Sequence, residues 1–293
     1  MLWIPITAFA ATLQVARNAL QRGLVGDAGP WGATLVRFLF GLPFAIAFAC
    51  AAALLTPGIA PVLTAKFWLF CAIGGGAQVL ATAAVLTSMH RAGFALGTVF
   101  QQSGVPIGAL MGLAFGDFLH PLAWVGLALA TAGLFYLSWP RHSPDITRDW
   151  TPAILGTVAG AFFALSSNMY RFAGISLDAH HPSFAGPATV VAVQAIQATG
   201  LGLYLAVRDR NALVAVVRSW RQSLGAGFFG AAASALWFTA FAMAPAGPVR
   251  AVGVVEMPVA AIAGNRFFAE RLTVGQWIAG AVTAAGVVMA ALF

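Results

Sequence analysis

The most regular feature of the chain is a series of long apolar stretches, separated by short polar connections. A helix needs about 20 apolar residues to cross a hydrocarbon core of about 30 Å. The stretches are too long and too continuous for the alternating strands of a membrane barrel, so we expect an all-α integral membrane protein. Ten spans are predicted, at residues 2–22, 31–55, 66–89, 94–115, 120–139, 151–174, 182–206, 220–243, 247–267 and 273–292.

Composition agrees with a chain that is surrounded by lipid. Hydrophobic residues make up 60% of the 293 residues and charged residues only 8%, whereas soluble domains carry about 25% charged residues. The net charge of +7 is scattered over short loops instead of forming one basic stripe. The basic residues therefore look like determinants of membrane topology, and we expect the bilayer as a partner but no nucleic acid.

The two halves of the chain share an ordered set of matching positions. Met89 to Gly93 recurs as Met243 to Gly247, and the order of the other matches is the same in both halves. These matches pair Asn18 with Asn168, Pro106 with Pro258, Asp117 with Glu270, Trp124 with Trp277, and Gly133 with Gly286. We predict two five-helix units, 1–140 and 150–293. Because five is odd, the second unit enters the membrane in the opposite sense, which gives an inverted repeat of the kind that builds alternating-access carriers. A purely structural duplication remains an alternative.

This pattern resembles the drug/metabolite transporter superfamily, in its ten-helix branch with two EamA-type repeats. The similarity is carried by the run from Pro258 through Glu270 and Leu272 to Gly286, and by the corresponding first-half run, which has Asp117 in place of the usual Glu. The resemblance implies that segments 1 to 4 and 6 to 9 enclose a central cavity. Segments 5 and 10, which are rich in small residues suited to close packing, then lie outside.

Polar side chains inside the predicted spans are the candidates for a binding site. A charged residue at mid-helix costs about 2.5 to 3.5 kcal/mol on insertion scales, so it needs a protein or aqueous surrounding. In the first span, Gln14, Arg17, Asn18 and Gln21 share one helix face, which should point into the bundle. The candidate substrate-binding residues are Gln14, Arg17, Asn18, Arg37, Gln78, Gln101, Gln102, Asn168, Trp237, Arg250 and Glu256. Snorkelling arginines and amides that only join helices are the alternative interpretation.

Glu256 lies near the middle of the ninth span and needs a partner. Arg250 is six residues away, about 240° around the helix, so it is not expected to pair with Glu256. Arg17 or Arg37 is the expected partner. Alternatively, Glu256 is protonated and carries a proton. Aromatic residues of the sixth and eighth spans form either a substrate-facing wall or ordinary packing; they are Phe162, Phe163, Trp237, Phe238 and Phe241.

These observations favour a secondary transporter, an exporter of a small organic metabolite across a bacterial inner membrane by alternating access. Three intramembrane arginines against one glutamate favour a carboxylate-bearing substrate, amino acids included, because guanidinium groups bind carboxylates in bidentate fashion. The alternatives are a passive channel and an intramembrane enzyme, although no GxSxG, HExxH or GxxxxGK[ST] motif is present. No cofactor, metal or catalytic residue is predicted. Proton coupling and oligomeric state are left open.

Orientation is the point on which charge and resemblance disagree. Ten basic residues follow the odd-numbered spans, against Lys66 and Arg171 on the opposite side. The positive-inside rule then places both termini outside the cytoplasm, whereas the resemblance implies that both are inside. We adopt the charge count. The ten residues are Arg22, Arg91, Arg141, Arg148, Arg208, Arg210, Arg218, Arg221, Arg266 and Arg271.

Overall fold

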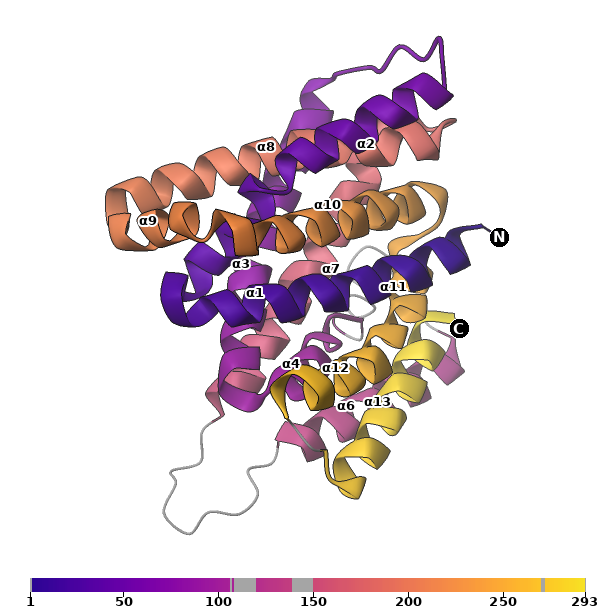
Figure 1. Ribbon diagram of the computed structural model, residues 1–293. Helices are drawn as coiled ribbons and strands as arrows, with labels where there is room; N and C mark the ends of the chain where they lie inside the picture. The colour runs from indigo at the N-terminus through magenta and orange to yellow at the C-terminus, as the bar shows by residue number, and fades with distance from the viewer. Residues whose placement is uncertain (1, 106, 108–119, 139–149, 270–271, 293) are drawn as a thin grey trace.

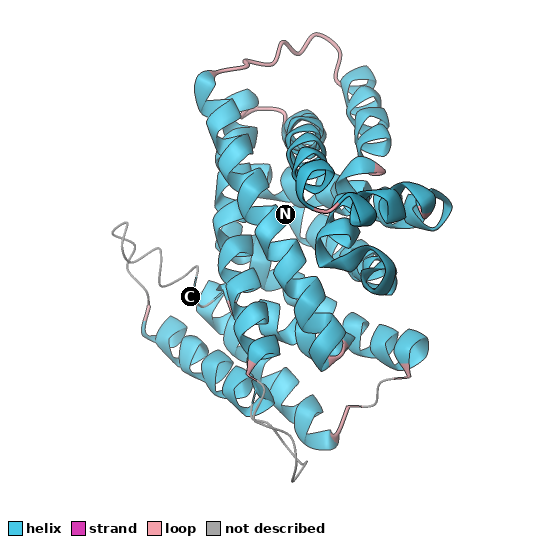
Figure 2. Ribbon diagram, turned by 90° about the vertical axis from the view of Figure 1, so that its left-hand side faces the viewer, coloured by secondary structure: helices cyan, strands magenta, loops and turns pink. Residues whose placement is uncertain are grey.

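The computed structural model describes residues 2–105, 107, 120–138, 150–269 and 272–292. Within these residues the chain consists of helices and their connections and contains no strand (Figure 2). Six of the described helical stretches are long and apolar enough to cross a membrane. They cover residues 3–55, 65–92, 151–177, 182–208, 220–243 and 246–268. The all-α prediction is therefore confirmed for the described residues.

The beginning of the chain differs from the two separate helices that were expected. Helix α1 (Trp3–Leu39) continues through the predicted loop and bends at Gly29, whose φ of 67° is accessible to glycine. Pro30 follows the bend, where its fixed φ suits the start of a new helical segment. The expected second span is instead divided between the end of α1 and helix α2 (Leu42–Leu55). The division lies at Gly41, which packs against the backbone of Gly227.

Three further helices of the first half are described. They are α3 (Ala65–Ala92), α4 (Phe94–Gln101) and α6 (Pro121–Ser138). After α4 the backbone tightens, because the amides of Gln102, Ser103 and Val105 donate to carbonyls three residues earlier. The expected fourth span, 94–115, lies outside the described residues beyond this point, as do the repeat positions Pro106, Asp117 and Glu270.

The second half contains the helices α7 (Thr151–Leu177), α8 (Pro182–Arg208), α9 (Arg210–Arg218), α10 (Trp220–Met243), α11 (Ala246–Val252), α12 (Glu256–Phe268) and α13 (Val274–Leu292). The predicted ninth span is interrupted by a 3-10 turn, η1 (Gly253–Val255). Pro258 explains this, since it has no N–H to donate to the carbonyl of Val254. The short helix α9 was not predicted. It begins at Asp209, whose side chain accepts from the amide of Ala212.

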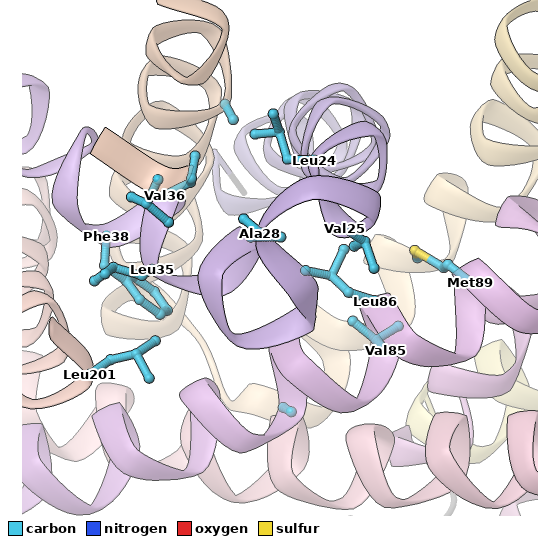
Figure 3. Close-up of a cluster of buried hydrophobic side chains, with 14 of the residues drawn as sticks. Leu24, Val25, Ala28, Leu35, Val36, Phe38, Val85, Leu86, Met89 and Leu201 are labelled. Carbon is cyan, nitrogen blue, oxygen red and sulfur yellow. The ribbon is translucent and has the colours of Figure 1, made fainter. Parts of the chain in front are cut away.

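The three helix pairs that pack most extensively are α3 with α7, α1 with α10, and α6 with α13 (Figure 1). In the largest apolar cluster, Val25 of α1 lies near Leu86 and Met89 of α3 (Figure 3). The pair α6 and α13 lies at the end of the molecule opposite α2 and α8. Residues of α1, α3, α7, α10 and α11 surround the centre.

Candidate functional site

A small cavity lies between α1, α3, α7, α10 and α11. Its volume is about 20 Å³, which is room for about one water molecule. No described residue of α6 or α13 contributes to its wall, and none of α4 or α8 does. The wall is formed by Gln14, Arg37, Gln78, Phe163, Ser166, Ser167, Tyr170, Ser234, Trp237, Phe238, Phe241 and Arg250.

Arg37 is the first of two arginines in this wall. It is only 2% exposed. Its Nη1 donates to Thr82 Oγ1 over 3.3 Å and its Nη2 to Ser234 Oγ over 3.1 Å. Its Nε is buried and meets no acceptor in the described part of the chain. Two hydroxyl groups therefore orient this guanidinium without neutralising its charge.

Arg250 faces the same cavity from the other half of the chain. Its guanidinium lies over the rings of Trp237 and Phe163, with 5.5 Å and 5.8 Å to the ring centroids. Such cation–π contacts stabilise a buried cation by about 0.5 to 2 kcal/mol. Gly253 allows the Trp237 ring to pack directly against the turn η1, where a side chain would collide with it. Arg250 Nη2 and Trp237 Nε1 are both buried without an acceptor among the described residues.

Aromatic rings form the remaining wall. Tyr170 stacks on Phe238 with 4.1 Å between ring centroids, and Trp237 stacks on Phe241 at 5.5 Å. The Tyr170 hydroxyl also lies 3.0 Å from Gln78 Oε1. The predicted aromatic wall is present for Phe163 and for the three rings of α10, but Phe162 packs instead against the apolar cluster of Figure 3.

Glu256 is held by amides rather than by an arginine. It is 1% exposed, and it accepts from Gln14 Nε2 at 2.5 Å, from Gln101 Nε2 at 2.6 Å and from Gln102 Nε2. No arginine forms a salt bridge with it in the described residues, so the prediction that Arg17 or Arg37 pairs with it is wrong at the level of direct contact. The physical reason is that α4 brings two amides to the start of α12.

Arg17 uses its guanidinium locally. Its Nε and Nη2 donate to Asn18 Oδ1 at 3.1 Å and 2.6 Å. The side chains of Arg17 and Arg37 both pass close to Gly230 of α10, where a β-carbon would lie 3.4 Å from the former and 3.0 Å from the latter. The polar face of α1 is thus buried as its spacing predicted, but Arg17 lies beside the cavity and not in its wall.

The structure brings together most of the eleven predicted residues. Five lie in the cavity wall: Gln14, Arg37, Gln78, Trp237 and Arg250. Five more are buried beside it: Arg17, Asn18, Gln101, Gln102 and Glu256. Asn168 is the exception, because its side chain is exposed and bonds to the carbonyl of Ala164. A rotation of about 100° per residue places the neighbouring Ser167, and not Asn168, toward the centre.

Sequence reasoning missed several wall and neighbouring residues. Ser166, Ser167, Tyr170 and Ser234 are weak signals because single hydroxyl groups are common in membrane helices. Gln194 and Gln197 of α8 were detectable, since they stand at i and i+3 like the amides that were noticed elsewhere. Both are 2% exposed.

Comparisons with known proteins give a similarity in fold and no information on function. No protein-family model matches the chain, and no curated protein matches it. The chain is similar to a solved structure known as "Crystal structure of protein", with a TM-score of 0.58 and 17% sequence identity over 99% of this chain and 96% of the other. At this identity the similarity concerns the fold alone.

Proposed function

We propose that the chain is a secondary transporter that exports a small carboxylate-bearing metabolite, amino acids included, across a bacterial inner membrane. In this proposal it has ten membrane spans in two inverted repeats, 1–140 and 150–293, and is related to the EamA-type drug/metabolite transporters. The observation that carries the proposal is a set of three buried donors without acceptors, on Arg37, Trp237 and Arg250, in the wall of one cavity.

Unpaired buried donors cost free energy unless a ligand or water meets them. A hydrogen bond to a charged group contributes about 1.5 to 3 kcal/mol, and an orphaned charged donor costs at least as much. The nearby carboxylate does not supply the acceptors, because Glu256 bonds to three glutamines and forms no salt bridge with an arginine among the described residues. The arrangement therefore suits an anionic oxygen pair that enters from outside, and guanidinium groups favour carboxylates. The stacked rings beside it suit an organic body.

The packing of the helices supports an internal repeat. In the proposed repeat, α1 corresponds to α7, α3 to α10, α4 to α12 and α6 to α13. A contact between α3 and α7 then requires an equivalent contact between α10 and α1, and both pairs of helices pack together. The same exchange leaves the pairs α6–α13 and α4–α12 unchanged, and these also pack together. Tight i→i−3 turns interrupt both corresponding spans, at Gln102–Val105 and at Gly253–Val255. Interrupted helices at matching positions are typical of carriers built from inverted repeats.

The small volume of the cavity supports a conformational cycle. About 20 Å³ holds water but no organic metabolite. A substrate that binds here requires the helices to separate, so it must bind another conformation more tightly than this one. Differential binding of this kind is what couples substrate occupancy to alternating access.

Binding and counterflow of carboxylates test the proposal. We expect Arg37→Gln and Arg250→Gln to weaken binding at least tenfold, since the loss of one charge-assisted bond of about 1.5 kcal/mol corresponds to a factor of about ten. Arg210→Gln, on an exposed position of α9, is the control. Thermal shift against a metabolite panel identifies the ligand, and saturable counterflow in liposomes distinguishes a carrier from a channel. Wild-type affinity in both well-folded cavity variants contradicts the proposal.

A further inference from the structure

A second, larger hollow lies on the outer face of α3 and α8. Its volume is about 460 Å³, within the range of about 300 to 1,000 Å³ that is usual for small-molecule sites. The groove is lined by Trp31, Ala72, Gly75, Gly76, Val79, Leu80, Ile196, Gln197, Gly200, Leu201 and Tyr204. No charged side chain takes part, and the lining is apolar except for one amide and one phenol.

Glycines in the lining leave the space of this groove open. A β-carbon at Gly76 or at Gly200 would meet no other atom within 4 Å. The same two helices carry exposed apolar residues, among them Leu80 of the groove wall at 43% and Leu203 at 64% exposed. In a protein that spans a membrane, such a surface faces acyl chains rather than water. At one end Trp31 and Tyr204 lie together, with 6.0 Å between ring centroids, a pairing that is typical of the membrane interface.

Gln197 joins the groove to the central cavity. It lines the groove and is 2% exposed. Its Nε2 donates to Gln78 Oε1 over 2.9 Å, and Gln78 lines the central cavity. Gln197 Oε1 is buried and receives no hydrogen bond from the described residues. The amide–amide bond therefore links the walls of the two hollows, beside contacts of Gln197 Nε2 with the carbonyl of Gly75 at 3.1 Å and with the Tyr170 hydroxyl at 3.5 Å.

We propose that the groove is a lateral subsite for the apolar part of the transported carboxylate, which passes between bilayer and cavity when the contact between Gln78 and Gln197 opens. The inference rests on the proposed function and extends it, because it makes the substrate amphipathic. The carboxylate meets Arg37 and Arg250 in the cavity, while the apolar body lies between α3 and α8. The groove supplies the volume that the cavity lacks in this conformation.

A chain-length series tests this subsite. Binding of acetate, butyrate, hexanoate and octanoate is measured in lipid nanodiscs for the wild type, for Gly200→Leu and for Gly202→Leu. Gly202 is the matched control, because a β-carbon there also meets nothing within 4 Å and the residue is on the same helix but outside the groove. We expect affinity to rise tenfold or more from acetate to octanoate in the wild type and in Gly202→Leu. The rise disappears in Gly200→Leu, while acetate binds as before.

The outcomes separate this inference from the proposed function. Partition into the bilayer raises apparent affinity equally in both leucine variants, so their difference reports the groove. If carboxylates bind through the arginines but the chain-length gain persists in Gly200→Leu, the lateral subsite is overturned and the proposed function stands. If no carboxylate binds the wild type, both fail. Should Gly200→Leu not fold, Gly76→Leu on α3 fills the same groove and gives the same readout.

Discussion

At the scale of single residues, Glu256 is distinguished by the three amides that surround it. Each of Gln14, Gln101 and Gln102 donates one N–H to its carboxylate. A buried amide that loses its acceptor costs about 1 to 3 kcal/mol. We call these three amides the donor shell of Glu256. They come from α1 and from the end of α4, and all three donate to a carboxylate, which can only accept.

The shell predicts different consequences for two substitutions. In Glu256→Gln, one surrounding amide can turn by 180° and present its oxygen, so most bonds re-form and the variant folds. In Glu256→Leu, all three amides lose their acceptor, and we expect a loss of several kcal/mol, from about 1 to 3 kcal/mol each. Thermal denaturation of the purified variants measures the difference. Equal melting temperatures for the two variants would show that the shell does not stabilise the fold.

Transport adds a second readout for Glu256→Gln. If the glutamate responds to the occupied cavity through Gln14, which contacts both, then removing its charge alters the rate of transport or its pH dependence while the fold survives. A substitution at the exposed Asn168, such as Asn168→Ala, should leave both unchanged. Identical pH profiles for wild type and Glu256→Gln would remove Glu256 from the transport cycle.

The sequence could predict which polar residues are buried, but not which of them touch. Helical spacing was sufficient for Gln14, Arg17 and Asn18, because residues three and four apart share a face. The partner of Glu256 depended on how far α4 approaches α12, which no local pattern encodes. The prediction that Asn168 faces the central site was wrong for a related reason. Its match to Asn18 in the repeat gives a position along the chain but not the direction in which the side chain points around the helix.

At the scale of helices, the apolar stretches predicted most elements, whereas interruptions inside them were missed. Hydropathy averages over about 19 residues, so it does not detect a bend at Gly29 or a turn at Gly253–Val255. Proline marks the second break, but prolines are tolerated in membrane helices and rarely decide a boundary. The helix α9 was hidden because its nine residues are too few and too polar for a span.

The pair α6 and α13 depends on small residues at reciprocal positions. A side chain at Gly133 would collide with Thr283 and the carbonyl of Ala279, and one at Gly286 with the backbone of Ala130. Close backbone approach of this kind is how membrane helices associate. We expect Gly133→Val and Gly286→Val to destabilise the protein by about 1 to 3 kcal/mol, as overpacking does.

Gly280 is the matched control for this helix pair. It lies on the same helix as Gly286, and a β-carbon there would make only an ordinary contact with Met257 Cε at 4.0 Å. Gly280→Val should therefore melt near the wild-type temperature in the same detergent. Equal losses at positions 280 and 286 would indicate that the helix pair tolerates separation and that glycine at 286 has no packing role.

At the scale of the whole molecule, the orientation in the membrane follows from where the arginines lie. Ten basic residues follow the odd-numbered predicted spans. Four of them lie at the corner formed by α8, α9 and α10, and all four are exposed: Arg208, Arg210, Arg218 and Arg221. On the opposite side, Arg171 is partly withdrawn, since its Nη1 donates to the carbonyl of Phe241 at 2.8 Å. By the predicted spans, these exposed arginines outnumber the exposed Lys66 of the opposite side.

Cationic loops are retained in the cytoplasm during insertion. We therefore predict that both termini lie outside the cytoplasm and that the corner around α9 lies inside, against the anionic lipid surface, where each basic residue contributes about 1 kcal/mol of attraction. An alkaline phosphatase fused after Phe293 should be active, whereas the same enzyme inserted at Asp209 should be inactive. A fluorescent protein at the same two sites should give the opposite pattern. Fluorescence after Phe293 together with phosphatase activity at Asp209 would place the termini inside, and the charge count would then be wrong.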